Sequence, residues 1–237
     1  MLTIILCVYN EFERLNLAYD DLKEVLKTFD ETTEIIIIDN GSSDGTREWI
    51  ESLKDHGVIK VFNEHNIGKG GSIRKGIKIA KGDYILIHDP DLEYSATDIP
   101  CLWRTVKENN SDLGLGSRVL GGENISYKYF QNYLGVAILT KLINLLYNST
   151  ISDPATAMKL MKSTFIKQLN LTNTGFNLDF ELVVKTLHMG GFISETRISY
   201  FPRTKAEGKK LRAWKDGLAS LVTIIKVKFS ERADMSN

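Results

Sequence analysis

The sequence lacks the features that mark secreted or nucleic-acid-binding proteins. Only two cysteines occur, Cys7 in an apolar run and Cys101 in a helical pattern, so we expect reduced thiols and no disulfide framework. Lys plus Arg and Asp plus Glu number 30 each, so no net charge draws the chain onto nucleic acid and any basic site must be local. No basic segment precedes the first apolar run, residues 2–8, which predicts that there is no secretory signal and that the protein is cytoplasmic.

Long hydrophobic runs are also missing. A membrane span needs roughly 18 apolar residues, and Lys141 and Asn144 interrupt the longest candidate, residues 133–147. The helical patterns at 127–148 and 214–229 each have an apolar side. The ordinary explanation of such a side is that it packs against the core. The alternative is that one of these helices contacts the cytoplasmic face of a membrane, or that the protein uses a separate membrane partner.

Short apolar runs alternate with helical patterns in the first half of the chain. The continuous run 35–38 predicts a strand covered on both faces, as in a parallel sheet between helix layers. The predicted strands are 2–8, 34–38, 58–62, 84–87 and 113–116, and the predicted helices are 12–28, 46–54, 70–80 and 97–108. This half is therefore expected to be an α/β fold of the nucleotide-binding type.

The pattern changes after residue 122. The predicted elements there are a helix at 127–148, a strand at 158–161, helices at 163–169 and 177–189, a strand at 192–200 and a C-terminal amphipathic helix at 214–229. A basic segment, 203–212, precedes the last helix. With 237 residues, the chain is predicted to be one α/β domain with a mainly parallel central sheet between helix layers.

Acidic residues follow the predicted strand at 84–87. In an extended chain Asp89, Asp91 and Glu93 would point to one side, and their hard oxygens suit Mg²⁺ or Mn²⁺. Polar segments 9–11 and 39–46 follow the first two strands in the same way. Because open α/β sheets place ligands at the carboxyl ends of their strands, these three segments predict one binding site.

A glycine-rich loop, residues 66–71, leads into the third predicted helix. The free N–H groups of that helix N-terminus, together with Lys69, favour a phosphate nearby. The spacing matches neither a Walker loop nor the dinucleotide fingerprint, so P-loop and nicotinamide enzymes are disfavoured.

Together these segments resemble the family-2 glycosyltransferases of the GT-A fold. That family carries a first-strand P-x-Y-N-E, a D-D-G-S-x-D-G-T turn, an N-x-G-K-G loop and a D-x-D, which correspond here to residues 7–11, 39–46, 66–70 and 89–91. Further likeness at 89–94, 116–118, 198–204 and 207–210 is to the dolichyl- or undecaprenyl-phosphate sugar transferases. Cys7 replaces the usual proline and Asn40 the second aspartate of the turn, so nucleotide preference is open.

The resemblance implies a nucleoside-diphosphate sugar as the donor and the GT-A nucleotide-diphospho-sugar transferase fold. Residues 1–120 would form the donor and metal half, and residues 121–237 the acceptor half. The base and ribose would contact Tyr9, Glu11 and Asp39, and the metal would bind Asp89, Asp91 and Glu93. The other donor-binding residues predicted at this rim are Asn10, Gly41, Ser42, Asn66 and Lys69.

The acceptor is a polyprenyl phosphate or a saccharide hydroxyl. A lipid phosphate requires positive charge for positioning, which the resemblance assigns to Arg118, Arg203, Lys209 and Lys210, although a basic loop can also be merely solvated. A hydroxyl requires a general base, for which Asp179, Glu181 and Asp153 are candidates. We expect an inverting, metal-dependent transferase in which Asp91 is catalytic. A saccharide acceptor and a non-catalytic nucleotide-sugar-binding module are the alternatives.

Overall fold

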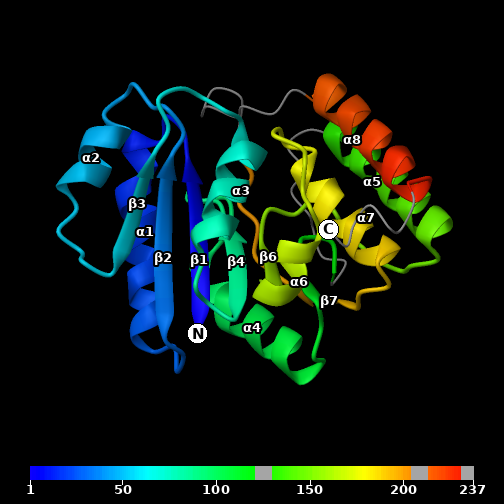
Figure 1. The fold of residues 1–237 in the computed structure, drawn as a ribbon, viewed down its shortest axis with the longest axis horizontal. Helices are drawn as coiled ribbons and strands as arrows, with labels where there is room; N and C mark the ends of the chain where they lie inside the picture. Colours follow the sequence, from blue (N-terminus) through cyan, green and yellow to red (C-terminus); the bar gives the residue numbers. More distant parts are fainter. Residues whose placement is uncertain (121–129, 204–212, 231–237) are drawn as a thin grey trace.

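The computed structural model describes residues 1–120, 130–203 and 213–230 (Figure 1). Each element predicted from the sequence corresponds to an observed one, with ends that differ by a few residues. In chain order they are β1 (Leu2–Val8), α1 (Phe12–Lys27), β2 (Thr33–Asp39), α2 (Thr46–Ser52), β3 (Val58–Phe62), α3 (Lys69–Ile79), β4 (Tyr84–His88), the 3-10 turn η1 (Ala96–Asp98), α4 (Ile99–Glu108), β5 (Leu113–Ser117), α5 (Phe130–Tyr147), β6 (Lys159–Lys162), α6 (Ser163–Gln168), α7 (Leu178–His188), β7 (Ile193–Arg197) and α8 (Ala213–Lys228).

Seven strands form one sheet in the order β3-β2-β1-β4-β6-β5-β7. Strand β6 runs antiparallel to both of its neighbours, and the other adjacent strands are parallel, so the prediction of a mainly parallel sheet is confirmed. The chain runs outward from β1 to β3 and then returns to β4 on the other side of β1. The strand order therefore reverses between β1 and β4, and such a point is where open α/β sheets bind ligands.

The isoleucine run in β2 shows how the sheet is buried. Ile36 and Ile38 belong to the apolar cluster on one face of the sheet, and Ile35 and Ile37 belong to the cluster on the other. Successive residues of a strand point to opposite faces, so four isoleucines in a row require cover on both sides. The helices supply this cover, as the apolar pattern predicted.

Strand β7 ends earlier than the sequence predicts. After Arg197 the chain leaves the sheet, because the peptide N–H of Ser199 donates to Asp98 Oδ2 (2.7 Å) and Tyr200 pairs with Tyr94 in an isolated antiparallel bridge. This diversion carries residues 200–203 to the acidic segment that follows β4.

Helices α5, α7 and α8 pack together at one end of the molecule (Figure 1). The Tyr147 hydroxyl in α5 donates to the carbonyl of Ile224 in α8 (2.9 Å), which joins these two helices. Among the residues described, no helix combines the length and apolar character that a bilayer crossing requires.

Candidate active site

The loops after β1 and β2 are tied together by two residues predicted to bind the donor. Ser42 Oγ accepts the peptide N–H of Asn10 (2.9 Å), and Asn10 Oδ1 accepts that of Ser43 (2.9 Å). Asn10 has a φ of 50°, a left-handed conformation in which asparagine is enriched. These side chains therefore shape the rim of the sheet, next to the partly buried Tyr9.

Asp39, the last residue of β2, is fully buried and has a partner that the sequence analysis missed. Its Oδ2 lies 2.7 Å from Arg47 Nη2, and its Oδ1 accepts the peptide N–H of Ser42 (3.0 Å). Arg47 lies in α2, and no motif marks it in the sequence. The charge of Asp39 is thus compensated inside the fold.

The amide of Asn40 has a structural use that explains its presence in place of aspartate. Its Nδ2 donates to Asn66 Oδ1 (3.0 Å), and its Oδ1 accepts the peptide N–H of Ile67 (3.0 Å). A carboxylate could accept the N–H of Ile67 but could not donate to Asn66, so the amide adds one bond to the Asn66 loop. Gly41 permits the close approach, because its φ is +78° and a Cβ there would lie 2.8 Å from the His65 backbone.

The loop before α3, where the sequence predicts a phosphate nearby, packs against the loop 172–175. The peptide N–H of Gly71 donates to the Thr174 carbonyl (3.2 Å), so loop 172–175 covers the helix N-terminus. Two glycines permit this packing: a Cβ on Gly68 would clash with the Thr174 carbonyl oxygen, and one on Gly70 would lie 2.6 Å from that of Asn173. One N–H group of the first turn of α3 is therefore already satisfied inside the fold, and the predicted phosphate contact stays a prediction.

Lys69 extends from this loop toward two carboxylates. Its Nζ lies 2.7 Å from Asp89 Oδ2 and 3.6 Å from Asp179 Oδ2. Asp179 in turn lies 3.3 Å from the ammonium of Lys159, which is fully buried in β6 and donates to the Thr156 carbonyl. Burial lowers the pKa of Lys69, but the two carboxylates outweigh it and raise the pKa above its ordinary value. Positive and negative side chains thus alternate from Lys159 in β6, through Asp179 in α7 and Lys69, to Asp89 in the acidic segment.

The acidic segment after β4 is turned rather than extended. Leu92 has a φ of 63°, and Asp91 Oδ1 accepts the peptide N–H of Glu93 (3.0 Å). Glu93 Oε2 accepts the Tyr200 hydroxyl (2.7 Å). The described part of the chain holds no group of three His, Cys, Asp or Glu side chains that could bind a metal. The expected metal site of Asp89, Asp91 and Glu93 is therefore not formed, because the turn directs Glu93 to other partners.

Arg203 binds this acidic segment. Its Nη2 lies 2.5 Å from Asp91 Oδ2, its Nε 3.1 Å from Glu93 Oε1 and its Nη1 3.1 Å from Glu11 Oε2. Three carboxylates at one rim hold a guanidinium strongly, because each contact is a charge-assisted hydrogen bond. The acceptor role predicted for Arg203 is not what this arrangement shows, since all its nitrogens face carboxylates.

Asp89 and Asp91 remain suited to a divalent cation. Burial and repulsion from Asp89 raise the pKa of Asp91 to about 7, against the opposing pull of Arg203. Burial also raises the pKa of Asp89, although Lys69 opposes it. Mg²⁺ commonly takes one or two protein carboxylates and completes its coordination with substrate phosphates and water. These two partly buried carboxylates fit that donor set, whereas Glu93 does not.

Glu181 lies away from this cluster. Residues two positions apart on a helix point roughly 200° apart, so Glu181 and Asp179 leave α7 on opposite sides. The Glu181 carboxylate accepts the peptide N–H groups of Thr172 and Asn173 (2.9 Å each) and lies 2.9 Å from Lys185 Nζ. It anchors the loop that covers α3, and this position gives no support to the predicted role as a base.

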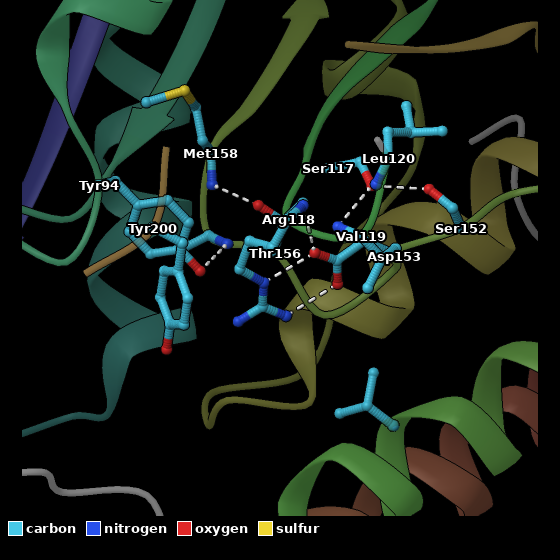
Figure 2. Close-up of polar contacts among 12 residues, drawn as sticks. Tyr94, Ser117, Arg118, Val119, Leu120, Ser152, Asp153, Thr156, Met158 and Tyr200 are labelled. Atoms are coloured by element: carbon cyan, nitrogen blue, oxygen red, sulfur yellow. Dashed lines mark hydrogen bonds and ion pairs between the residues drawn. The ribbon is translucent and has the colours of Figure 1, made fainter. Parts of the chain in front are cut away.

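The guanidinium of Arg118 faces Asp153, as Figure 2 shows. Nε and Nη2 of Arg118 lie 2.7 and 2.8 Å from the two carboxylate oxygens, and the guanidinium stacks 5.0 Å from the centre of the Tyr200 ring. Burial raises the pKa of Asp153, but the contacts with Arg118 outweigh it and lower the pKa below its ordinary value. The Arg118 side chain is 10% exposed, and within the described residues its Nη1 has no hydrogen-bond partner. Lys209 and Lys210, also predicted to bind the acceptor, lie outside the described residues.

Two curated relatives match most of this chain in sequence. A dolichol-phosphate mannosyltransferase of Pyrococcus furiosus is 26% identical over 210 residues, which are 87% of this chain and 58% of that protein. The low-salt glycan biosynthesis hexosyltransferase Agl6 of Haloferax volcanii is 26% identical over 219 residues, which are 91% of this chain and 51% of that protein. The chain thus spans about half the length of the curated relatives it matches.

A solved structure and a family match complete the comparison. Glucosyl-3-phosphoglycerate synthase from Mycobacterium tuberculosis, in complex with Mn²⁺, uridine diphosphate and phosphoglyceric acid, has a TM-score of 0.72 to this chain at 17% identity, covering 98% of this chain and 80% of that one. This likeness concerns the fold, which is the predicted GT-A fold. Residues 3–169 match the model of Glycosyl transferase family 2, and the chain therefore belongs to that family, as its motifs predicted.

Proposed function

We propose that the protein transfers a sugar from a nucleoside-diphosphate sugar to a polyprenyl phosphate, with inversion at the anomeric carbon. The name of the Pyrococcus furiosus relative supports a lipid-phosphate acceptor. In this proposal residues 1–120 bind the donor and residues 121–237 form the acceptor side of a single domain. The base and ribose lie near Tyr9, Glu11 and Asp39, at the rim that Asn10 and Ser42 shape.

Asp89 and Asp91 hold Mg²⁺ or Mn²⁺ in this proposal. Their support is that both are largely enclosed and that enclosure raises the pKa of each, so that neighbouring cations only partly compensate their negative charge. A divalent cation bound there neutralises the charge that grows on the departing nucleoside diphosphate. The manganese and uridine diphosphate in the synthase from Mycobacterium tuberculosis are compatible with this choice of ion.

A phosphate acceptor is favoured because every carboxylate considered as a base is already paired with a cation. Asp179 lies between two lysines, Glu181 is held by a lysine and a loop, and Asp153 is held by Arg118. A sugar hydroxyl must lose its proton to such a base, whereas a phosphate oxygen is already anionic and needs only to be oriented. Nη1 of Arg118, which has no hydrogen-bond partner in the part of the chain that the structure describes, is suited to orient it. The phosphate oxygen forms a bond to the anomeric carbon while the bond to the diphosphate breaks.

A donor screen tests this function first. UDP-, GDP-, CDP- and dTDP-sugars are added with Mn²⁺, and the correct donor at about 100 times its Kd stabilises the fold by roughly 2.7 kcal/mol. Transfer from that donor to undecaprenyl phosphate and to a saccharide is then compared. Transfer only to the saccharide hydroxyl would favour the second acceptor class, and binding without transfer or hydrolysis would leave a nucleotide-sugar-binding module.

The exposed surface of α5 and α8 suits an acceptor that resides in a membrane. Large exposed apolar residues recur every three or four positions along α8 and the residue after it, and at intervals of four and seven positions in α5. They are Leu134, Ile138, Leu145, Trp214, Leu218, Val222, Ile225 and Phe229, which we call the α5–α8 face. We propose that this face contacts an anionic bilayer on its cytoplasmic side. Lys215 and Lys226 border the apolar stripe of α8, whereas its one acidic residue, Asp216, lies on the opposite side of the helix. The charge of these lysines complements anionic lipid headgroups.

A further inference from the structure

Each carboxylate proposed to hold the metal is covered by an internal cation. The Lys69 ammonium lies 2.7 Å from Asp89, and the Arg203 guanidinium lies 2.5 Å from Asp91. A divalent cation that binds the same oxygens is repelled by these positive charges, more strongly because the site is buried. Metal binding therefore requires that the internal cations find other partners.

A second carboxylate lies within reach of each cation. Arg203 already contacts Glu11 and Glu93 at 3.1 Å, so it keeps two partners when it releases Asp91. Among the described residues, Lys69 has Asp179 as its one alternative carboxylate, at 3.6 Å. Closing that gap to an ordinary hydrogen-bond length takes a shift of about 1 Å.

The surroundings of Lys69 allow its side chain to move while its backbone stays in place. Gly68 and Gly70 pack directly against the backbone of loop 172–175, which fixes the chain on both sides of Lys69. The ammonium also lies 5.9 Å from the centre of the Phe176 ring, which attracts a cation at either position.

Lys159 fixes the alternative carboxylate. Its side chain is 0% exposed and reaches Asp179 Oδ1 at 3.3 Å, while Asp179 Oδ2 faces Lys69. A buried carboxylate needs such a partner to stay ionised. Asp179 thus presents one oxygen to a fixed cation and the other to the cation that must move.

We propose that Asp179 is a positioning residue that receives the Lys69 ammonium when a divalent cation binds Asp89, and that Lys159 holds Asp179 in place for this exchange. The inference rests on the proposed metal-dependent transfer and deepens it. Asp179 then has a role other than that of a general base. Lys69 is a counter-ion of Asp89 that moves away from it when the metal binds.

Calorimetric titration of the full chain with Mn²⁺ alone tests the exchange. In Asp179→Asn, Lys69 has no alternative to Asp89, so Mn²⁺ binding weakens roughly tenfold. In Lys69→Met the competing cation is gone, so binding tightens roughly tenfold. In the double variant Lys69→Met/Asp179→Asn, the loss caused by Asp179→Asn largely disappears, because no ammonium is left to relocate.

Asp55→Asn is the matched control, since Asp55 also pairs with a lysine, Lys23 at 2.7 Å, but lies in the loop before β3, away from the site. Its Mn²⁺ affinity is expected to equal that of the unmodified chain. An equal loss from Asp179→Asn with and without Lys69 overturns the inference and leaves metal binding intact. If Asp179→Asn does not fold, the test uses Lys69→Met alone. Unchanged or weaker Mn²⁺ binding by Lys69→Met would then overturn the inference. If the unmodified chain binds no Mn²⁺, both this inference and the proposed metal dependence fail.

Discussion

Arg203 and Asp91 are 112 positions apart in the chain, and their side chains lie 2.5 Å apart. The contact joins the segment after β7 to the segment after β4, next to the bridge between Tyr94 and Tyr200. It places a guanidinium inside the cluster that the sequence presents as purely acidic. The charge balance of the site therefore depends on a residue from the second half of the chain.

Replacement of Arg203 by Met keeps the length of the side chain and removes its charge. Three partly buried carboxylates then lose their shared partner, which is expected to lower the free energy of unfolding by about 3 kcal/mol near neutral pH. Because protonation relieves repulsion among carboxylates, the deficit shrinks toward about pH 5. Urea unfolding of both proteins at several pH values measures it, and a deficit independent of pH would contradict an electrostatic role for Arg203.

Asp91 gives the metal-free protein a characteristic pH dependence. Its pKa in the folded state is raised to about 7 from an ordinary value of 3.8, so between these values the folded state binds the proton more tightly than the unfolded chain. Stability is therefore expected to fall as pH rises through this window and to level off above it. Asp91→Asn should remove this decline and be more stable than the unmodified protein at about pH 8, by on the order of 2 kcal/mol. Chemical unfolding in EDTA gives the comparison, and parallel pH profiles would refute it.

The sequence predicted the fold well, because the patterns that determine it are local. The run 35–38 needed cover on both faces, and the polar segments after β1, β2 and β4 had to meet at one edge of a parallel sheet. The antiparallel direction of β6 was not predictable from its short apolar run, since that pattern is the same in either direction.

The partners of the site residues were less predictable, because ion pairs form between residues distant in the sequence. Nothing in a helix pattern links Arg47 to Asp39, and nothing in a strand pattern links Lys159 to Asp179. Leu92 with its positive φ was also unexpected, since leucine seldom adopts that conformation. That single turn separates Glu93 from the predicted metal ligands.

The pair of Arg118 and Asp153 is expected to depend on the shape of guanidinium as well as on its charge. Arg118→Lys keeps the charge, but one ammonium cannot contact both carboxylate oxygens in parallel or stack on Tyr200. We expect a loss of about 1–3 kcal/mol in stability and a raised KM for the acceptor with little change in the KM for the donor. Denaturant unfolding and steady-state kinetics test these two parts. An acceptor KM equal to that of the unmodified protein would show that Nη1 of Arg118 does not bind the acceptor.

Glu181→Gln tests whether Glu181 acts as a base for a hydroxyl acceptor. The glutamine can still accept one peptide N–H but loses the ion pair with Lys185 and one acceptor oxygen for loop 172–173, so stability is expected to fall by about 1–3 kcal/mol. If the acceptor is a phosphate, kcat at a temperature where the variant is fully folded stays within about threefold, because no base is removed. A loss of kcat by about 100-fold or more without unfolding would instead identify Glu181 as a base for a hydroxyl acceptor.

Membrane contact through the α5–α8 face can be followed by the fluorescence of Trp214. This tryptophan is 83% exposed, whereas Trp103 is buried and Trp49 is largely enclosed, so a membrane mainly changes the emission of Trp214. Vesicles that contain anionic lipid are expected to shift its emission to the blue and to sediment with the protein, whereas vesicles of neutral lipid do so weakly because the lysines then find no opposite charge. Phe229→Ser removes an apolar side chain that is 77% exposed, so it should weaken vesicle binding several-fold while stability stays unchanged. Phe192→Ser is the control, because Phe192 is exposed but lies outside this face, and vesicle binding should not change. If the protein forms dimers at micromolar concentration and does not bind anionic vesicles, a second copy of the chain covers the α5–α8 face instead.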